Sequence, residues 1–348
     1  MPETQIRPVT AITIGDPAGI GPEIVVDTVR SEMIYDICKP FVIGAREHLE
    51  EAAAVKGVEL TINEISEPEE AKYEFGTVDL LDTGAAPGAK IVYGEVQKDA
   101  ALRAYSYLEK SIELGLAGRL HAVSTAPIHK VALKEAGVDH IGHTEIFEAL
   151  TDSPYALTMF NVHKLRVFFL TRHVSVRKAC DQITKERTLA YLKDIDREMR
   201  SYGFENPSIA VAALNPHGGD GGLFGTEEIE HLIPAVEEAQ AMGINARGPL
   251  PGDSIFAFAL DGQHDCILSL YHDQGHIACK TLDFEKAVTI TMGLPFMRSS
   301  VDHGTAFDIA GKAIADHGTM MSAYRAGSDF APYADRIRAD FEAGDSEA

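Results

Sequence analysis

Short β-rich runs alternate with helical patterns along the chain, and this alternation limits the possible folds more than any other feature. Runs such as TAITIG (10–15), TVDLLD (77–82) and CILSLYHD (266–273) have the length and composition of strands. Helical patterns lie between such runs, for example over 226–242 and in the long amphipathic stretch 94–118. Strands separated by helices need crossover connections. We therefore predict an α/β fold, a mainly parallel sheet with helices on both faces.

Length and charge limit the number of domains and the class of partner. A chain of 348 residues is long for one core, so we expect two domains or lobes, although no linker marks a boundary. With 31 basic and 53 acidic residues the formal charge is -22. This charge argues against a nucleic-acid or membrane surface, both of which need clustered cations. An anionic small molecule needs only a local basic pocket.

The N-terminal stretch and the cysteines bear on localisation. MPETQIRPVTAITIG lacks the pattern of a signal peptide, and no apolar run approaches the ~20 residues that span a bilayer. The four cysteines are scattered and form no C-x-x-C pair. We expect a reduced, cytoplasmic protein.

Polar and glycine-rich patches follow the expected strands, where open α/β sheets bind their ligands. So many patches at strand ends indicate one site assembled from distant segments. They are IGDPAGIGPE (14–23), STAPIHK (124–130), GHTE (142–145), TRH (171–173), NPHGGDGG (215–222), PGDS (251–254) and YHDQGH (271–276).

Three histidines occupy equivalent places after apolar runs. His173, His217 and His272 are each followed by a polar or glycine-rich turn, so all three could reach the same edge of a parallel sheet. Three convergent imidazoles form a divalent-metal site. The alternative is that each is a structural histidine, and the sequence leaves the two readings about equal.

The stretch HDQGH (272–276) is close to the H-E-x-x-H zinc signature, in which two histidines share one helical face. A hydrolase built on it would need a helix here. Gly275 disfavours a helix, and the preceding CILSLY favours a strand end. We therefore do not expect the two histidines to form a metalloprotease site, and His276 is not a predicted ligand.

A basic pocket is predicted from four residues. Lys280 and Arg298, with His143 and Thr144 of GHTE, would suit a phosphate monoester. The alternative is that the two cations are ordinary surface residues.

Two further motifs could hold a nucleotide. GDPAGIGPE fits neither standard nucleotide fingerprint, so it is either a phosphate-binding turn or a structural one. SSVDHGTAFDIAGK (299–312) is expected to open a helix, where His303, Gly304, Thr305 and Asp308 suit a ribose and phosphate. The alternative is a well-capped helix.

Together these motifs resemble the 4-hydroxythreonine-4-phosphate dehydrogenase family of pyridoxal-phosphate biosynthesis and its paralogues acting on D-threonate or D-erythronate 4-phosphate. The matching pieces run in order from residue 14 to about 312. They are GDPAGIGPE, TAPIHK, GHTE, the histidine after FFLT, LNPHGGDGG, the GD pair at 252–253, YHDQGH and GLPFMRSSVDHGTAFDIAG.

The resemblance implies an isocitrate/isopropylmalate dehydrogenase-like fold in which residues 1–348 form two interleaved α/β lobes with a cleft. HGTAFDIAGK is similar to the loop that contacts the adenosine side of NAD in isopropylmalate dehydrogenases. The resemblance also implies a homodimer with active sites at the subunit interface. The cofactors would be NAD, or alternatively NADP, and a divalent metal: Zn, Mg, Co or Mn.

Carried over by resemblance, the metal ligands are His173, His217 and His272. The substrate contacts are His143, Thr144, Lys280 and Arg298, and Thr289 stands where the family has an asparagine. Asp253, Asp273 and Lys280 are the candidates for catalytic proton transfer or for support of the ligands.

The resemblance to the paralogues predicts the reaction. HIAC (276–279) departs from the Leu-Pro pair of the biosynthetic enzymes and favours D-threonate or D-erythronate 4-phosphate. The expected reaction is oxidation at C3 followed by decarboxylation to dihydroxyacetone phosphate. The alternatives are 4-hydroxythreonine 4-phosphate giving 3-amino-2-oxopropyl phosphate, or a non-catalytic phosphate-ligand sensor.

Overall fold

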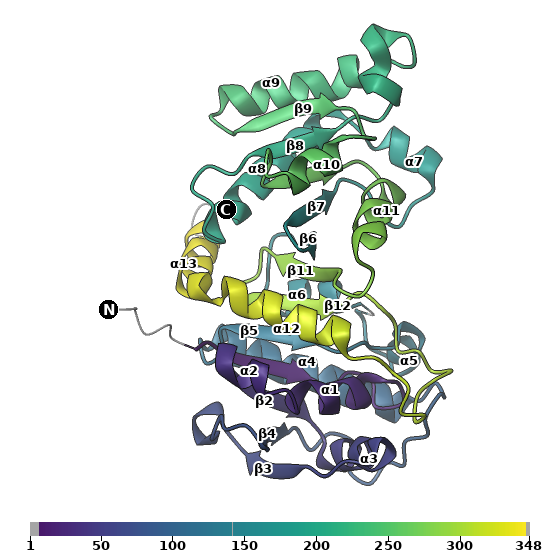
Figure 1. Cartoon of the computed structure of the whole chain (residues 1–348), viewed down its shortest axis with the longest axis vertical. Helices are drawn as coiled ribbons and strands as arrows, with labels where there is room; N and C mark the ends of the chain where they lie inside the picture. Colours follow the sequence, from purple (N-terminus) through teal and green to yellow (C-terminus); the bar gives the residue numbers. More distant parts are fainter. Residues whose placement is uncertain (1–6, 141, 346–348) are drawn as a thin grey trace. The chain divides into compact units, whose positions relative to one another are not determined.

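The computed structural model describes residues 7–140 and 142–345. The chain divides into two compact units, and the first is formed by two separate stretches of the sequence (Figure 1). The first comprises Met1–Ala156 and Val288–Ala348, and the second comprises Leu157–Ala287.

The first unit is built on a mainly parallel sheet, in which only β12 and β11 pair antiparallel. In spatial order its strands are β3 (Thr61–Ile65), β4 (Thr77–Asp82), β2 (Lys39–Gly44), β1 (Val9–Thr13), β5 (Ala122–Thr125), β12 (Met297–Val301) and β11 (Val288–Met292). Ala11 and Ile12 point to opposite faces of β1, and both are fully buried. The sheet is therefore covered on both sides.

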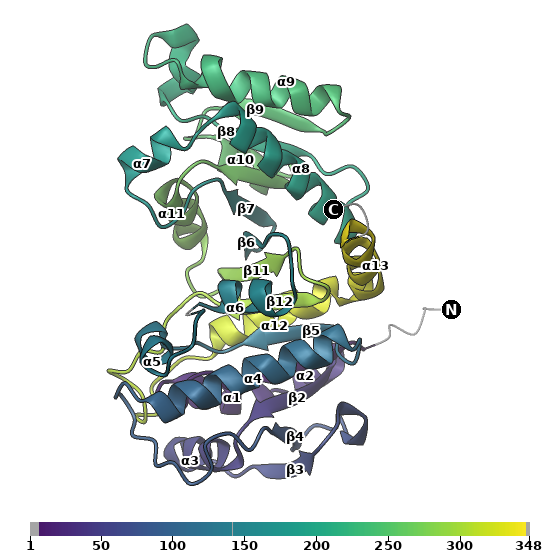
Figure 2. The same ribbon diagram turned by 180° about the vertical axis from the view of Figure 1, so that it is seen from behind.

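Helices cover the two faces of this sheet in separate groups (Figures 1 and 2). One face carries α1 (Gly21–Val29), α2 (Glu32–Ile37) and α12 (Gly318–Phe330), and the other carries α4 (Lys98–Leu116), α5 (Lys130–Glu135) and α6 (His143–Leu150). The remaining helices of the unit are α3 (Arg46–Lys56), which packs on α1, the short turns η1 (Pro68–Glu70) and η4 (Ala331–Tyr333), and α13 (Ala334–Asp345).

Among the strands of the second unit, β6 and β7 pair antiparallel and the other described pairs are parallel. Their order is β6 (Leu157–Val162), β7 (Leu165–Phe169), β10 (Cys266–Ser269), β8 (Ile209–Ala212) and β9 (Ala246–Leu250). Figure 2 shows α8 (Lys185–Ser201) in front of these strands and α10 (Ile255–Leu260) behind them. The other helical segments are α7 (Val176–Asp181), η2 (Pro216–Gly222), η3 (Glu228–Leu232), α9 (Ile233–Ala241) and α11 (His272–Leu282).

The α/β class predicted from the alternation is confirmed. The strand predicted over 77–82 has those bounds, and the long helix predicted within 94–118 is α4. The helix predicted over 226–242 is instead a π-helical turn, η3, followed by α9. Pro234 lies in the first turn of α9, where its missing N–H is tolerated. No described helix is long and apolar enough to cross a membrane.

Candidate active site

An arginine lies buried in the first unit without a carboxylate partner. Arg298 on β12 is 2% exposed, and none of the described residues forms an ion pair with it. Its Nη1 donates to Thr291 Oγ1 at 2.7 Å and its Nη2 donates to Thr125 Oγ1 at 2.8 Å. The buried Nε atom has no hydrogen-bond partner. Burial lowers the pKa of Arg298 to about 9, and Glu145 partly opposes this effect.

Strand pairing explains why the two threonines meet this arginine. Arg298 lies opposite Thr291 in the antiparallel ladder of β12 and β11. It lies beside Val123 in the parallel ladder of β12 and β5. Thr125 is two residues beyond Val123 and so shares its face of the sheet. Sequence reasoning missed both threonines because the neighbours of β12 were not known.

His143 lies close enough to Arg298 to feel its charge. It is the first residue of α6, and its buried Nε2 atom has no hydrogen-bond partner. Burial lowers the pKa of His143 well below its ordinary value, and the charges of Arg298 and Lys130 lower it further, while a hydrogen bond to the backbone of Ala126 raises it. The structure thus groups His143 with Arg298, and Arg298 is not the surface cation of the alternative reading.

The other predicted substrate residues are only half-buried. Thr144 follows His143 on α6 and is half-buried. Thr289 is a half-buried residue of β11, opposite Ser300. Lys280 lies in the second unit on α11, with its Nζ 5.3 Å from the ring centroid of Phe284.

The three predicted metal ligands follow neighbouring parallel strands of the second unit, as expected. His173 lies in the loop after β7, His217 in the turn η2 after β8, and His272 at the first position of α11 after β10. The ring centroids of His173 and His272 are 6.0 Å apart. The ring of His217 is 6.4 Å from that of Phe224.

The turn that carries His217 has an unusual backbone. Residues 217–222 all have positive φ, and two of them, His217 (φ 56°) and Asp220 (φ 44°), are not glycine. Consecutive left-handed residues are strained for side chains with a Cβ. The buried Glu228 accepts hydrogen bonds from the backbone N–H groups of Leu214 (2.8 Å) and Asn215 (2.7 Å), and so holds the start of the turn. Glu228 was not predicted from the sequence.

A pocket of about 430 Å³ lies beside this turn within the second unit. His217, Asp253 and Asp273 line it, so the structure brings one predicted ligand together with two predicted catalytic carboxylates. Gln274, also in the lining, donates from Nε2 to the carbonyl of Ala213 at 2.8 Å and accepts the Leu270 N–H at 2.8 Å. It thereby ties the ends of β8 and β10 to α11, a role that the sequence did not reveal.

The prediction that HDQGH is not helical was wrong. The segment begins α11, and Gly275 is required there because the helix lies directly on β7. A Cβ at Gly275 would lie 2.6 Å from Phe169 Cε1 and 2.9 Å from Val167 Cγ1. The helix nevertheless does not form a zinc-protease pair. The rings of His272 and His276 stack at 3.9 Å and 11°, and His276 Nδ1 donates to the His272 carbonyl at 2.8 Å.

The three histidines fit a divalent metal in chemistry but are not gathered around one point. Imidazole nitrogen is a common ligand, and Asp273 Oδ1 engages Nδ1 of His272 at 2.7 Å, which leaves Nε2 for a metal. Over residues 7–140 and 142–345, however, no group of three His, Cys, Asp or Glu side chains could hold an ion. The three histidines therefore do not form a metal centre among the described residues of one chain.

The motif 299–312 begins within β12 and continues as a loop after Val301, so the prediction that it opens a helix was wrong. Ala306 (φ 43°) and Gly311 (φ 76°) are left-handed, and α12 begins only at Gly318. The fully buried Glu23 of α1 accepts the N–H groups of Gly311 (2.6 Å) and Ala313 (2.9 Å). These contacts replace the bonds of a helix.

The predicted nucleotide residues lie on this loop. His303 donates from Nδ1 to the carbonyl of Gly304 at 3.0 Å, Thr305 is 7% exposed, and Gly304 and Asp308 are exposed. The turn GDPAG packs against the same loop. A Cβ at Gly19 would lie 2.7 Å from the Thr305 carbonyl oxygen.

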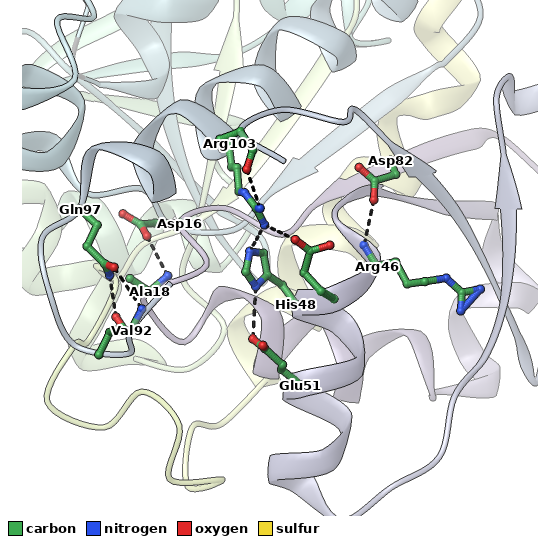
Figure 3. Close-up of polar contacts among 11 residues, drawn as sticks. Asp16, Ala18, Arg46, His48, Glu51, Asp82, Val92, Gln97 and Arg103 are labelled. Atoms are coloured by element: carbon green, nitrogen blue, oxygen red, sulfur yellow. Dashed lines mark hydrogen bonds and ion pairs between the residues drawn. The ribbon is translucent and has the colours of Figure 1, made fainter. Parts of the chain in front are cut away.

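Asp16, at the start of that turn, is a buried carboxylate (Figure 3). Its Oδ1 accepts the N–H of Ala18 at 2.9 Å, whereas the buried Oδ2 has no hydrogen-bond partner. Burial raises the pKa of Asp16 to about 6, and the bond from Ala18 opposes this effect. Such a carboxylate is typical of functional sites.

An arginine anchors the segments around this turn, as Figure 3 also shows. The buried Arg103 of α4 donates from Nη1 to Glu47 Oε1 at 2.7 Å and also contacts Nε2 of His48. Its Nη2 donates to the carbonyl of Ala86 at 2.8 Å. Burial, followed by the charge of Arg103, lowers the pKa of His48. Arg103 therefore joins α3 and α4 to the loop that follows β4.

Comparison with known proteins decides the family. The model of the family described as "Pyridoxal phosphate biosynthetic protein PdxA" matches residues 36–327. The chain belongs to the PdxA family. A relative from Symbiobacterium thermophilum, named "Putative D-threonate 4-phosphate dehydrogenase", is 49% identical over 332 residues, which are 95% of this chain and 99% of the relative.

Solved structures of PdxA-family proteins share the fold. A 4-hydroxythreonine-4-phosphate dehydrogenase from Burkholderia phymatum is 40% identical, with a TM-score of 0.84 over 93% of this chain and 98% of that one. The enzyme of the same name from Klebsiella pneumoniae is 36% identical, with a TM-score of 0.87 over 93% and 99%. The family predicted from the motifs is confirmed, and the chain stands among dehydrogenases that act on a hydroxyl group.

Proposed function

We propose that the protein is a dehydrogenase of a 4-phosphorylated four-carbon hydroxy acid that uses NAD and a divalent metal. It would oxidise the C3 hydroxyl of D-threonate or D-erythronate 4-phosphate and release CO2, giving dihydroxyacetone phosphate and reduced cofactor. The PdxA relationship and the relatives named for D-threonate 4-phosphate at 47–49% identity support this choice.

The observation that carries the proposal is the buried pair of Arg298 and His143. Both have a buried nitrogen without a hydrogen-bond partner, and the guanidinium is held by two neutral hydroxyls. A buried cation held only by neutral hydroxyls is suited to an anion. We assign Arg298 and His143 to the 4-phosphate, with Thr144 of the same helix as His143 as a further contact.

The remaining predicted residues would act on the reacting end of the substrate and on the cofactor. His173, His217 and His272 would hold the metal, which when bound lowers the pKa of the alcohol and stabilises enolate charge. Asp253, Asp273 and Lys280 are the candidates for proton transfer, and the first two line the pocket beside His217. His303, Gly304, Thr305 and Asp308 would contact NAD. Thr289, shorter than asparagine, would leave one substrate contact weaker.

We also propose a homodimer with active sites at the subunit interface, on the strength of the family relationship. Sedimentation at a series of protein concentrations tests this. A dimer that persists at assay concentration is expected, whereas a fully active monomer would contradict it.

A substrate comparison tests the proposed reaction. Purified protein with NAD and a divalent metal would receive the 4-phosphates of D-threonate, D-erythronate and 4-hydroxythreonine in turn, and reduced cofactor would be followed by absorbance. We expect the highest kcat/KM with one of the two sugar acids. A higher kcat/KM with the 4-hydroxythreonine compound would favour the second candidate, the reaction named for the structural relatives. Binding without turnover of any of them would favour a sensor.

A further inference from the structure

The hydrogen bonds of His143 determine what its imidazole can offer a ligand. Nε2 has no partner, so the backbone hydrogen bond to Ala126 involves the other ring nitrogen, Nδ1. That bond favours the protonated ring, which means that Nδ1 donates its hydrogen to the Ala126 carbonyl. In a neutral imidazole the remaining nitrogen is an acceptor. The neutral ring therefore presents a lone pair at Nε2.

Burial and the charges around His143 favour the neutral ring. Arg298 on β12 and Lys130 on α5 both disfavour a second positive charge, and desolvation acts in the same direction. Glu145, on the same helix as His143, acts on Arg298. A phosphate dianion would offset the charges of Arg298 and Lys130 and so favour a proton on Nε2.

A phosphate dianion cannot hydrogen-bond to a lone pair, because all of its oxygens are acceptors. We propose that phosphate binding at Arg298 and His143 takes up one proton from solvent, which is then shared between His143 Nε2 and a phosphate oxygen. This inference rests on the proposed function, which assigns the substrate phosphate to these two residues. No other bond forms or breaks in the step.

Proton uptake would make the dissociation constant of the phosphate ligand depend on pH. A phosphate monoester loses its second proton near pH 6, so above about pH 7 both the free ligand and the free ring lack the shared proton. Each further pH unit then raises the dissociation constant about tenfold, by proton linkage. Without proton uptake, the dissociation constant would change little over this range.

Calorimetric titration of the full chain with D-threonate 4-phosphate at pH 8 tests the proposal. Repeating the titration in buffers of different ionisation enthalpy measures the protons taken up. Wild type is expected to take up about one. His143→Gln presents an amide N–H2 donor and is expected to bind without this proton and with a pH-independent dissociation constant. The matched control His140→Gln, at an exposed histidine three residues earlier, is expected to behave as wild type.

The outcomes separate this inference from the proposed function. Wild-type binding at pH 8 without proton uptake overturns the inference and leaves the proposed function standing. Equal proton uptake by wild type and a folded His143→Gln variant also overturns it. If His143→Gln does not fold, the wild-type proton count and pH dependence decide alone. No binding of D-threonate 4-phosphate between pH 6 and 8, about the range of a phosphate monoester, overturns the proposed function itself.

Discussion

Arg298 retains its positive charge inside the protein because neutral hydroxyls hold it. Thr125 and Thr291 fix the direction of the guanidinium without neutralising it, so the charge remains available to a ligand. A carboxylate in either position would pair with the guanidinium and compete with the substrate phosphate. Binding of the substrate phosphate is therefore expected to depend on these two threonines as well as on the arginine.

Removing one of these hydroxyls should harm stability and substrate binding together. Thr291→Val leaves Nη1 of Arg298 buried without an acceptor, which costs about 1–3 kcal/mol of unfolding free energy. We expect KM for the phosphorylated substrate to rise several-fold with kcat changed much less, as measured by urea unfolding and steady-state kinetics. Thr13→Val is the matched control, because Thr13 Oγ1 is buried without a hydrogen-bond partner. Equal losses in the two variants would count against the account.

Asp16 should destabilise the protein at neutral and alkaline pH. Its folded pKa of about 6 lies above the ordinary 3.8, so its contribution to stability is present below pH 3.8 and is lost as pH rises through 6. The shift corresponds to roughly 3 kcal/mol at most. Asp16→Asn should therefore raise the unfolding free energy at pH 8 by about 1–3 kcal/mol and have little effect near pH 4. Urea unfolding at both pH values measures this, and a less stable variant at pH 8 would contradict the burial argument.

At the scale of elements, α11 forms a helix against the local preference of Gly275 because the helix packs on β7. Gly275 disfavours a helix by about 1 kcal/mol, yet it lets the helix lie on Phe169 and Val167 of β7. The sequence pattern could not show this contact, because it joins segments about a hundred residues apart. The loop 303–313 is the reverse case, in which Glu23 takes the N–H groups that a helix would use.

Gly275→Ala should destabilise the protein despite its better helix propensity. The added methyl would overlap Phe169 and Val167, and overpacking costs typically 1–3 kcal/mol. Gly327→Ala in α12 is the control, because its Cβ would meet Ser299 Oγ at 3.4 Å, an ordinary contact. The control should be neutral or more stable by up to about 1 kcal/mol. Thermal unfolding of both variants decides, and a stabilised Gly275→Ala would show that α11 does not lie so close to β7.

Glu23→Gln tests the support of the loop 303–313. The amide group would turn a donor toward one of the N–H groups of Gly311 and Ala313, at a cost of about 1–3 kcal/mol. If the loop binds NAD, we expect KM for NAD to rise with little change in KM for the acid. Unchanged stability and cofactor KM would mean that Glu23 does not hold the loop.

For the whole molecule, the alternation of strands and helices was enough to predict the α/β class, and the motifs were enough for the family. Because each follows an apolar run, His173, His217 and His272 were also correctly predicted to lie after neighbouring parallel strands. Strand order could not be read from the sequence. The threonines that hold Arg298, and the roles of Glu228 and Gln274, depend on that order and became visible only in three dimensions.

On this proposal, Arg298 and His143 select a phosphorylated acid for oxidation. The most direct measurement compares D-threonate 4-phosphate with unphosphorylated D-threonate, following reduced cofactor, CO2 and dihydroxyacetone phosphate together. The account predicts turnover of the phosphorylated acid alone, with the three products formed in equal amounts. Equal turnover of the unphosphorylated acid, or no reduced cofactor from either acid, would contradict it.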